Sequence, residues 1–273
     1  MCTAWEPGKR TIWARECCRK SKDKPEGFVP TVDADEQLDS GMAIIPAGFD
    51  WTTPFIADAC VQLGLPVRIG PPGLRPNIAG AKAAGPARPA RHAGSTDVFL
   101  EAIANARAGE ILVIDNGGRT DEGCIGDLVV GEAHMSGLAA TLCWGTHRDT
   151  GAILAMAAKV WSLGTCPNGP LSLRPRPADA LASARFGDLT IGLDDIVFAD
   201  DDGVVVTAAP TIDRVVAAAQ DIAAREGAQA ARLLEGDLLR VQLDLNGYVQ
   251  KRESDPSYTF RDHLKSFGGA IEI

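Results

Sequence analysis

The sequence predicts an α/β domain, because strand-like and helix-like segments alternate along it. Two apolar runs of strand length, Glu110–Asp115 and Ala139–Trp144, are separated by a segment in which Asp127 can begin a helix. A long alanine-rich helix pattern follows from Thr211 to Leu234. With 273 residues, the chain is long enough to bury one sizeable core. These observations favour a sheet covered by helices.

The first elements along the chain are an extension, a segment of turns and a helix. Residues 1–45 carry many charges and little periodicity, so we expect an N-terminal extension there. Residues 66–95 are rich in proline and glycine, which predicts short strands and turns. The amphipathic pattern from Asp97 to Arg107, ended by Ala108-Gly109, predicts a helix that leads into the strand at Ile111.

The central unit starts with the β-branched strand Glu110–Asp115, which we expect to end in a turn at Asn116–Gly118. Asp127 is then the expected N-cap of the next helix. Four side chains at near-helical spacing are expected to form the buried face of this helix, with Gly131 beside them. They are Leu128, Met135, Leu138 and Leu142.

The expected lengths of the helix and of the second strand place the two ends of this unit side by side. A helix of about 11 residues descends roughly 16 Å, and a strand of about 5–6 residues climbs roughly the same distance back. Arg148 and Asp149 should therefore lie beside Gly126 and Asp127. In a right-handed strand–helix–strand unit, this is the sheet edge at which open α/β sheets bind ligands.

The residues at this edge suggest a ligand. The helix-start amides of Leu128 and Val129 suit a carboxylate, which Arg148 can grip through two parallel hydrogen bonds. Asp127 and Asp149 offer hard oxygens to Mg²⁺ or to its water molecules. This set indicates an oxo-acid held on a divalent cation. A structural interpretation is also open, because Arg-Asp pairs are common on surfaces and Gly-Asp is an ordinary helix start.

Two later segments have structural interpretations. Asp200–Gly203 lies between Val197–Ala199 and Val204–Val206, and Asp-Gly between strands predicts a hairpin in preference to a calcium site. The helix pattern from Thr211 to Leu234 ends near Gly236 and should cover one face of the sheet.

Composition argues against several classes of function. A net charge of −9, from 36 acidic and 27 basic residues, disfavours nonspecific binding to nucleic acid. No apolar run approaches the ~20 residues of a membrane-spanning helix, and the N-terminus lacks the apolar segment of a signal peptide, so we expect a cytoplasmic protein. Seven cysteines without metal-ligand spacing disfavour a disulfide framework or a zinc site.

Several motifs resemble one known family. From Val113 to Asp149 the chain is similar to the regulator of ribonuclease activity A and to its enzymatic relatives, the class II 4-hydroxy-4-methyl-2-oxoglutarate aldolases. The matched segments are Ile114–Gly118, Gly126-Asp127, Arg148-Asp149 and Gly192–Val206, with weaker similarity at Pro54–Ala59 and Gly94–Glu110. Together they extend the resemblance over residues 50–240.

The resemblance implies roles for individual residues. By it, Arg148 binds the carboxylate of pyruvate and Asp149 ligates Mg²⁺ or Mn²⁺. Asp127 orders water on the metal and helps to relay a proton. The pyruvate pocket is completed by Gly126, Leu128 and Val129. A glutamate near the C-terminal helix is borrowed from a neighbouring subunit, and Glu226 is the candidate. The alternatives are Glu235 and Glu253.

The resemblance also implies a fold, a layered β/β/α swivelling-type domain with a compact β core. Such domains form homotrimers or homohexamers that close their sites between subunits. We expect this catalytic domain over residues 46–240, followed by a tail over residues 241–273 that docks on the core or on a neighbouring subunit. The chain has Trp144 where many relatives have an acidic residue, and Trp144 and His147 are candidates to line the second-substrate pocket.

The implied activity is that of a divalent-metal-dependent lyase. It cleaves a 4-hydroxy-2-oxo acid, such as 4-hydroxy-4-methyl-2-oxoglutarate, to pyruvate and a second oxo-acid, with decarboxylation of oxaloacetate as a companion activity. Both reactions leave a pyruvate enolate, which a metal ion and a cation stabilise. The alternative is a non-enzymatic regulator that binds a ribonuclease assembly, as the founding member of the family does.

Overall fold

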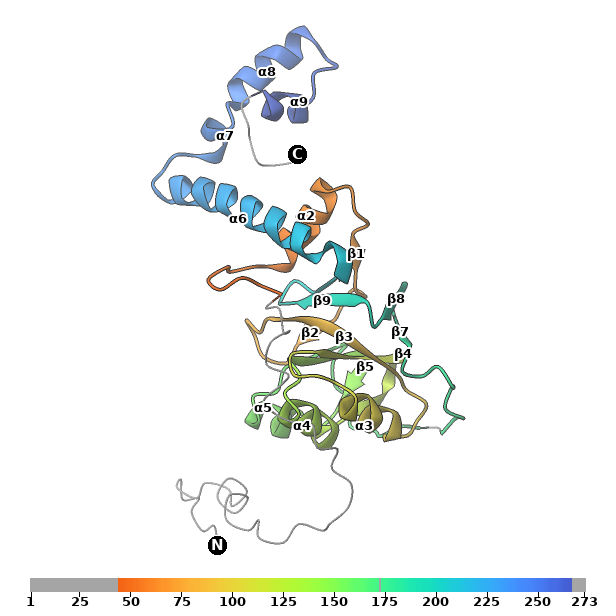
Figure 1. The fold of residues 1–273 in the computed structure, drawn as a ribbon. Coiled ribbons are helices and arrows are strands. Elements are labelled where there is room, and N and C mark those ends of the chain that lie inside the picture. Colours follow the sequence, from red (N-terminus) through yellow and green to blue (C-terminus); the bar gives the residue numbers. More distant parts are fainter. Residues whose placement is uncertain (1–43, 172, 267–273) are drawn as a thin grey trace, which may run out of the picture. The chain divides into compact units, whose positions relative to one another are not determined.

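The computed structural model describes residues 44–171 and 173–266 of the chain (Figure 1). Most of the extension expected over residues 1–45, and residues 267–273 of the expected tail, lie outside the described part. Within that part, no helix combines the length and the apolar character needed to cross a membrane.

An eight-stranded sheet, in the order β1-β10-β9-β3-β4-β5-β6-β2, forms the centre of the fold. Its strands are β1 (Arg68–Ile69), β2 (Arg75–Pro76), β3 (Ala83–Arg91), β4 (Ile111–Ile125), β5 (Ala140–His147), β6 (Val160–Ser162), β9 (Asp195–Ala199) and β10 (Val204–Ala208). Strands β3 to β6 are parallel neighbours, and the other pairings are antiparallel. A separate hairpin consists of β7 (Ser183–Phe186) and β8 (Leu189–Gly192).

Helices connect these strands and cover them. They are α2 (Thr53–Gln62), α3 (Asp97–Ala104), α4 (Asp127–Met135), α5 (Thr150–Ala155), α6 (Ile212–Leu234), α7 (Leu239–Gln242), α8 (Leu245–Ser254) and α9 (Phe260–Lys265), with a short 3-10 helix, η1 (Ala209–Thr211), before α6. Each of α3, α4 and α5 joins two parallel strands, so the expected strand–helix–strand unit is confirmed as β4-α4-β5. Figure 1 shows these three helices together on one side of the sheet.

Three clusters of buried side chains show how the layers stack. One cluster, around Phe99, lies between the parallel strands and helices α3 to α5. A second, around Phe198, lies between β9 and β10 and helices α2 and α6, as expected for a long helix that covers one sheet face. The third contains Trp161 and joins side chains from both halves of the sheet. Trp161 Nε1, on β6, donates to Asp200 O at 2.8 Å, in the turn that follows β9. Because β6 and β9 are not neighbours in the sheet, the sheet curls around a compact core.

Strand β4 is longer than the sequence indicated. The turn predicted at Asn116–Gly118 is wrong, because the strand continues to Ile125 with shifts in its register against β5. Gly117 and Gly118 have φ values of 66° and 70°, which bend the strand without ending it. Glycine-rich segments signal bulges as well as turns. The extra length carries the chain to the start of α4 beside the end of β5.

The face that α4 buries differs from the predicted one. Leu128 and Met135 are 82% and 83% exposed. The buried side chains of the helix are Val129, Val130 and Ala133. Both faces of α4 carry apolar residues, and its β-branched face packs on the sheet. Leu138 and Leu142 are buried, but they lie beyond the helix.

The expected hairpin at Asp200–Gly203 is confirmed, because these residues join β9 to β10 and Asp200 N donates to Gly203 O at 3.0 Å. The Asp200 carboxylate accepts hydrogen bonds from the amide and the hydroxyl of Thr53, both at 2.7 Å, and from Asp202 N at 2.9 Å. These contacts make Asp200 a structural acceptor. The described residues contain no group of three or more histidine, cysteine or acidic side chains arranged to hold a metal.

Replacement of Asp200 should therefore destabilise the fold. Asp200→Ala leaves two buried donors of Thr53 without partners, and we expect the free energy of unfolding to fall by about 3 kcal/mol. Urea denaturation measures this loss. The matched change Asp202→Ala, at an exposed position of the same turn, should cost under about 0.5 kcal/mol. Equal losses in the two variants, or stabilisation of the wild type by Ca²⁺, would contradict the structural role.

The aromatic residues of the expected tail contact one another. The ring of Tyr248 lies 5.0 Å from Phe260 and 6.2 Å from Tyr258, measured between centroids. His263 is buried among them, and its Nε2 lies 3.1 Å from Leu243 O. Helices α8 and α9 thus share a small aromatic cluster of their own. Docking of this segment on a neighbouring subunit stays a prediction.

Candidate active site

The end of β4, the start of α4 and the end of β5 meet at a small pocket of about 120 Å³. Six of the seven site residues expected from the sequence line it: Gly126, Asp127, Leu128, Val129, Arg148 and Asp149. The two strands are joined at this point by a hydrogen bond from Arg148 N to Ile125 O at 2.9 Å. The end of β5 thus lies beside the start of α4, as predicted from the lengths of a helix and a strand that run in opposite directions.

Arg148 and Asp149 are open to solvent and loosely paired. Their side chains are 45% and 43% exposed, and Arg148 Nε lies 3.4 Å from Asp149 Oδ2. Asp149 is the N-cap of α5 and has φ 59° and ψ 34°, in the left-handed region. This conformation costs a non-glycine residue roughly 1–2 kcal/mol. Strain of this kind is concentrated at functional sites, and here it fixes the direction of a carboxylate.

Gly126 leaves the space into which this carboxylate points. A Cβ at Gly126 would overlap Asp149 Oδ2 and would lie 3.3 Å from both Cγ and Nε of Arg148. Gly126 is also the N-cap of α4, one residue before Asp127, which was expected to be the cap. Asp127 is instead the first residue of the helix. The missing side chain at Gly126 therefore leaves room for the side chains of Asp149 and Arg148 at the start of α4.

The amides at the start of α4 are not equally available. Asp127 Oδ1 accepts a hydrogen bond from Leu128 N at 2.9 Å. The amide of Leu128 can therefore reach a bound carboxylate only after the Asp127 side chain turns away. Val129 is third in the first helical turn, where amides have no acceptor within the helix. Its amide is the better placed of the two to bind an anion.

Glu226 is the expected site residue that this chain does not bring to the pocket. It lies on α6 and lines a larger pocket of about 670 Å³ together with Phe49 and Phe55. Burial and the neighbouring Asp58 raise the pKa of its carboxyl. The two alternatives to Glu226 do not line the small pocket either. Glu235 is the C-cap of α6, and Glu253 is exposed on α8.

Trp144 and His147 do not line the small pocket. The indole of Trp144 packs on Gly118 and lies under the guanidinium of Arg185, at 5.5 Å from its ring centroid. His147 is buried, and burial lowers its pKa although a hydrogen bond to Gly164 opposes the shift. That these side chains line a pocket for the second substrate stays a prediction.

The segment Cys166–Pro170 is a wall of the pocket that the sequence did not reveal. Gly123 N donates to Asn168 O at 2.7 Å, and a Cβ at Gly169 would lie 3.0 Å from Arg148 Nη1. Pro170 lines the pocket directly. Proline, asparagine and glycine in this segment signal a turn. Nothing in their order shows that the turn folds back onto Arg148.

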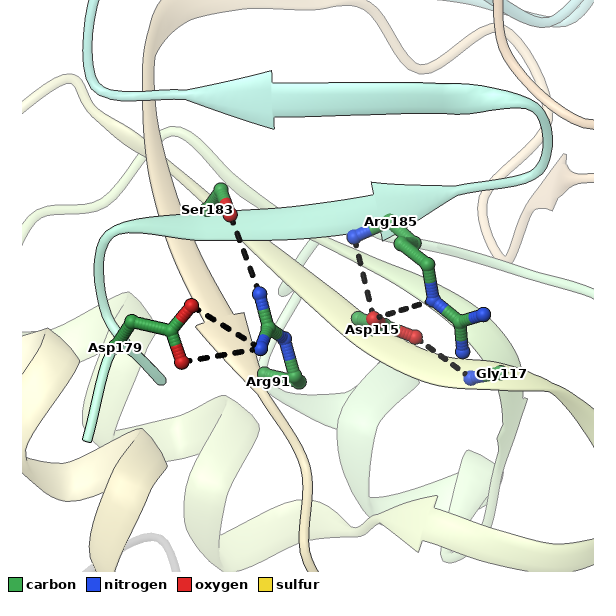
Figure 2. A network of polar contacts seen from close by, with 6 residues as sticks. All are labelled: Arg91, Asp115, Gly117, Asp179, Ser183 and Arg185. Carbon is green, nitrogen blue, oxygen red and sulfur yellow. Dashed lines mark hydrogen bonds and ion pairs between the residues drawn. The ribbon is translucent and has the colours of Figure 1, made fainter. Parts of the chain in front are cut away.

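A polar network lies beside the middle of β4 and the end of β3 (Figure 2). The buried carboxylate of Asp115 accepts hydrogen bonds from Gly117 N at 2.9 Å and from Arg185 N and Nε at 3.2 and 3.3 Å. Arg91 of β3 donates to Asp179 at 3.2 Å and to Ser183 Oγ at 3.3 Å. These bonds tie β7 to β3 and β4, and so they hold the bulged part of β4 in place.

The space at Gly126 provides a test of the pocket. The backbone of Gly126 is extended, at φ −136°, so alanine is tolerated there by conformation and excluded only by contact. Gly126→Ala should displace the Asp149 carboxylate and lower the expected release of pyruvate by about 100-fold, with a modest change in melting temperature. The matched control is Gly151→Ala in α5, where an added Cβ meets nothing within 4 Å. Similar turnover in the two variants would contradict the role of this space.

Comparison with known proteins identifies the family. A family model described as RraA-like, Aldolase/RraA, matches residues 53–206, which is more than half of the chain. The chain belongs to the RraA-like family. Its structure resembles that of Streptomyces coelicolor RraAS2, titled an unusual member of the RNase ES inhibitor RraA protein family, with a TM-score of 0.54 and 26% identity over 66% of this chain and 91% of the other. The expected layered α/β fold is thereby confirmed.

Two curated relatives carry the name "Putative 4-hydroxy-4-methyl-2-oxoglutarate aldolase". The protein of Bacillus cereus is 29% identical over 107 residues, which are 39% of this chain and 66% of the relative. The protein of Dechloromonas aromatica is 31% identical over 99 residues, 36% of this chain and 60% of the relative. The chain thus matches less than two thirds of the length of either relative.

Proposed function

We propose that this protein is a divalent-metal-dependent lyase that releases pyruvate from a 4-hydroxy-2-oxo acid, with oxaloacetate decarboxylation as a companion activity. The observation that carries the proposal is the meeting of Arg148, Asp149 and the start of α4 at one pocket. A volume of about 120 Å³ suits a fragment of pyruvate size. The relatives named as aldolases support the same reaction class.

The donor set fits Mg²⁺ or Mn²⁺. Mg²⁺ in proteins keeps several water molecules and is held through one or two carboxylates, so it needs no larger cluster of ligands. Asp149 supplies one carboxylate, exposed and directed into the space that Gly126 leaves. Asp127 supplies the second, on the first turn of α4. When bound, the metal ion supplies positive charge that stabilises an enolate.

The residues of the chain carry the remaining steps. Arg148 binds the substrate carboxylate through two parallel hydrogen bonds, and the amide of Val129 adds a third donor. The C3–C4 bond breaks as the C4 hydroxyl loses its proton, which makes the second oxo-acid and leaves the enolate of pyruvate. Asp127 relays a proton through water, and protonation of the enolate at C3 completes the product. In oxaloacetate the departing group is CO₂, and the same enolate forms.

We infer that a second copy of the chain completes the site. Glu226 does not reach the pocket of its own chain. Leu128, at the rim of the pocket, and Met135 leave an apolar face of α4 in solvent, which is typical of a surface that another chain covers. In a homotrimer or homohexamer, a neighbouring subunit can both supply Glu226 to the pocket and cover the apolar face of α4. Sedimentation velocity at assay concentration tests this assembly, and a monomer that turns over substrate would contradict it.

The activity is tested by pyruvate release from 4-hydroxy-4-methyl-2-oxoglutarate and from oxaloacetate, coupled to lactate dehydrogenase. Protein stripped of metal with a chelator should be inactive, and added Mg²⁺ or Mn²⁺ should restore release. Samples without protein correct for spontaneous decarboxylation. No release from either substrate with either metal would refute the proposal.

A regulator of a ribonuclease assembly is the second candidate function. The likeness to the Streptomyces protein, which is named as a member of the RNase ES inhibitor RraA protein family, favours this function. This function predicts dose-dependent inhibition of a ribonuclease E-type enzyme without metal-dependent release of pyruvate. The lyase predicts the reverse, so the two assays together separate the two candidates.

A further inference from the structure

His147 is the last residue of β5, directly before Arg148 and Asp149, and both nitrogens of its buried ring are engaged. Nδ1 lies 2.8 Å from Ser162 Oγ on β6. Nε2 lies 3.1 Å from Thr150 Oγ1, on the first residue of α5. The ring therefore contacts the next strand on one side and the next helix on the other.

Ser162 continues these contacts to the backbone of Gly164. Its Oγ accepts a hydrogen bond from Gly164 N at 3.2 Å and lies 3.1 Å from Gly164 O. In either tautomer of the ring, Thr150, His147 and Ser162 therefore form one continuous series of hydrogen bonds that ends at Gly164.

These hydrogen bonds hold the backbone on both sides of Arg148 and Asp149. His147 and Thr150 flank Arg148 and Asp149 in sequence, and their side chains are joined to each other. The backbone of His147 is also fixed on both sides, because its amide donates to Gly164 O at 3.1 Å and its carbonyl accepts from Cys166 N at 2.9 Å. A dipeptide held at both ends has few conformations open to it.

Asp149 needs such restraint. Its left-handed backbone costs free energy and persists only where the surroundings impose it. No hydrogen bond from its side chain caps α5. The hydrogen bond between the His147 and Thr150 side chains spans Asp149, so it restrains the turn.

We propose that His147 is a positioning residue which, through Ser162 and Thr150, holds Asp149 in its left-handed conformation and aims the carboxylate at the start of α4. The inference rests on the proposed function, because Asp149 is the metal ligand of that site. His147 does not line the pocket, so it acts through Asp149 and not on a bound ligand. Outer partners that orient a ligand typically change metal affinity by 10–100-fold when they are removed.

The test uses the hydroxyl of Thr150, which is only half-buried, so its replacement leaves the fold in place. Thr150→Val removes the hydroxyl and keeps the side-chain shape, whereas Thr150→Ser keeps the hydroxyl. Mn²⁺ binding to the full chain is followed by the electron paramagnetic resonance signal of free Mn²⁺, and pyruvate release is measured across a Mg²⁺ titration. Thr207→Val is the control for a buried threonine, because the hydroxyl of Thr207 has no hydrogen-bond partner among the described residues.

Thr150→Val should weaken Mn²⁺ binding by about 10-fold and raise the half-saturating Mg²⁺ concentration equally, with kcat at saturating Mg²⁺ within about 3-fold of the wild type. Thr150→Ser and Thr207→Val should match the wild type. Wild-type binding in Thr150→Val would overturn the inference and leave the proposed function standing. A wild type that neither binds Mn²⁺ nor releases pyruvate would overturn both, and the failure would then be visible before any variant is made.

Discussion

Arg148→Ala is expected to lower kcat/KM for pyruvate release by about 1,000-fold. The guanidinium is the cation of the pocket, and it is free to form two parallel hydrogen bonds with a carboxylate because its present contact with Asp149 is long, at 3.4 Å. Loss of two charge-assisted bonds corresponds to about 4 kcal/mol, which is about three powers of ten in rate. Binding of pyruvate itself, measured by calorimetry, should disappear.

The stability of this variant should not change by more than about 0.5 kcal/mol, because Arg148 is half-exposed and its ion pair is a surface one. Arg148→Lys keeps the charge without the planar fork and should retain part of the activity. Arg174→Ala removes another exposed arginine, one that does not line the pocket, and should have wild-type kinetics. Unchanged kinetics in Arg148→Ala would contradict the assignment of this pocket as the active site.

Asp149→Asn should abolish activation by Mg²⁺ and reduce turnover at least 100-fold. Asparagine tolerates the left-handed backbone that Asp149 adopts, so this change removes the negative charge and leaves the conformation in place. A neutral amide oxygen is a much weaker ligand for a hard divalent cation than a carboxylate. The variant thereby separates the metal role of Asp149 from its role in the turn.

The expected loss is read from activity across a Mg²⁺ titration and from Mn²⁺ binding. Asp188→Asn, exposed in the turn between β7 and β8, is the matched control and should respond to Mg²⁺ as the wild type does. Retained Mg²⁺ activation in Asp149→Asn would refute the metal role and would favour Asp127 as the ligand.

The pocket could be predicted from the sequence because it depends on local dimensions. The rise per residue of a helix and of a strand is known, so the lengths of these elements place Arg148 beside Gly126 without reference to the rest of the fold. The hairpin at Asp200–Gly203 and the helix α6 were predictable for the same reason, since turn chemistry and a 3.6-residue period act over short distances.

The buried face of α4 could not be predicted, because apolar residues lie on both of its faces. Spacing alone favoured Leu128 and Met135, whereas the sheet buries Val129 and its neighbours. The prediction of the length of β4 was wrong for a related reason, since Gly117 and Gly118 are compatible with a turn and with a bulge. In both cases tertiary packing decided between two locally acceptable structures.

Long-range contacts account for the remaining differences. The loop around Asn168 reaches Gly123 across 45 positions of sequence, and no local pattern encodes that pairing. Glu226 belongs to a helix that packs on β9 and β10, so one chain cannot bring it to the pocket on the edge of β4 and β5. A contribution of Glu226 to the pocket therefore belongs to the proposed assembly, in which a second copy of the chain supplies it.

The most direct test of the central claim is the Mg²⁺-dependent release of pyruvate from 4-hydroxy-4-methyl-2-oxoglutarate and oxaloacetate by the wild type and by Arg148→Ala, side by side. The account predicts release by the wild type that requires the metal and falls about 1,000-fold in the variant. Equal release by the two proteins, or none by the wild type with either metal, would contradict it.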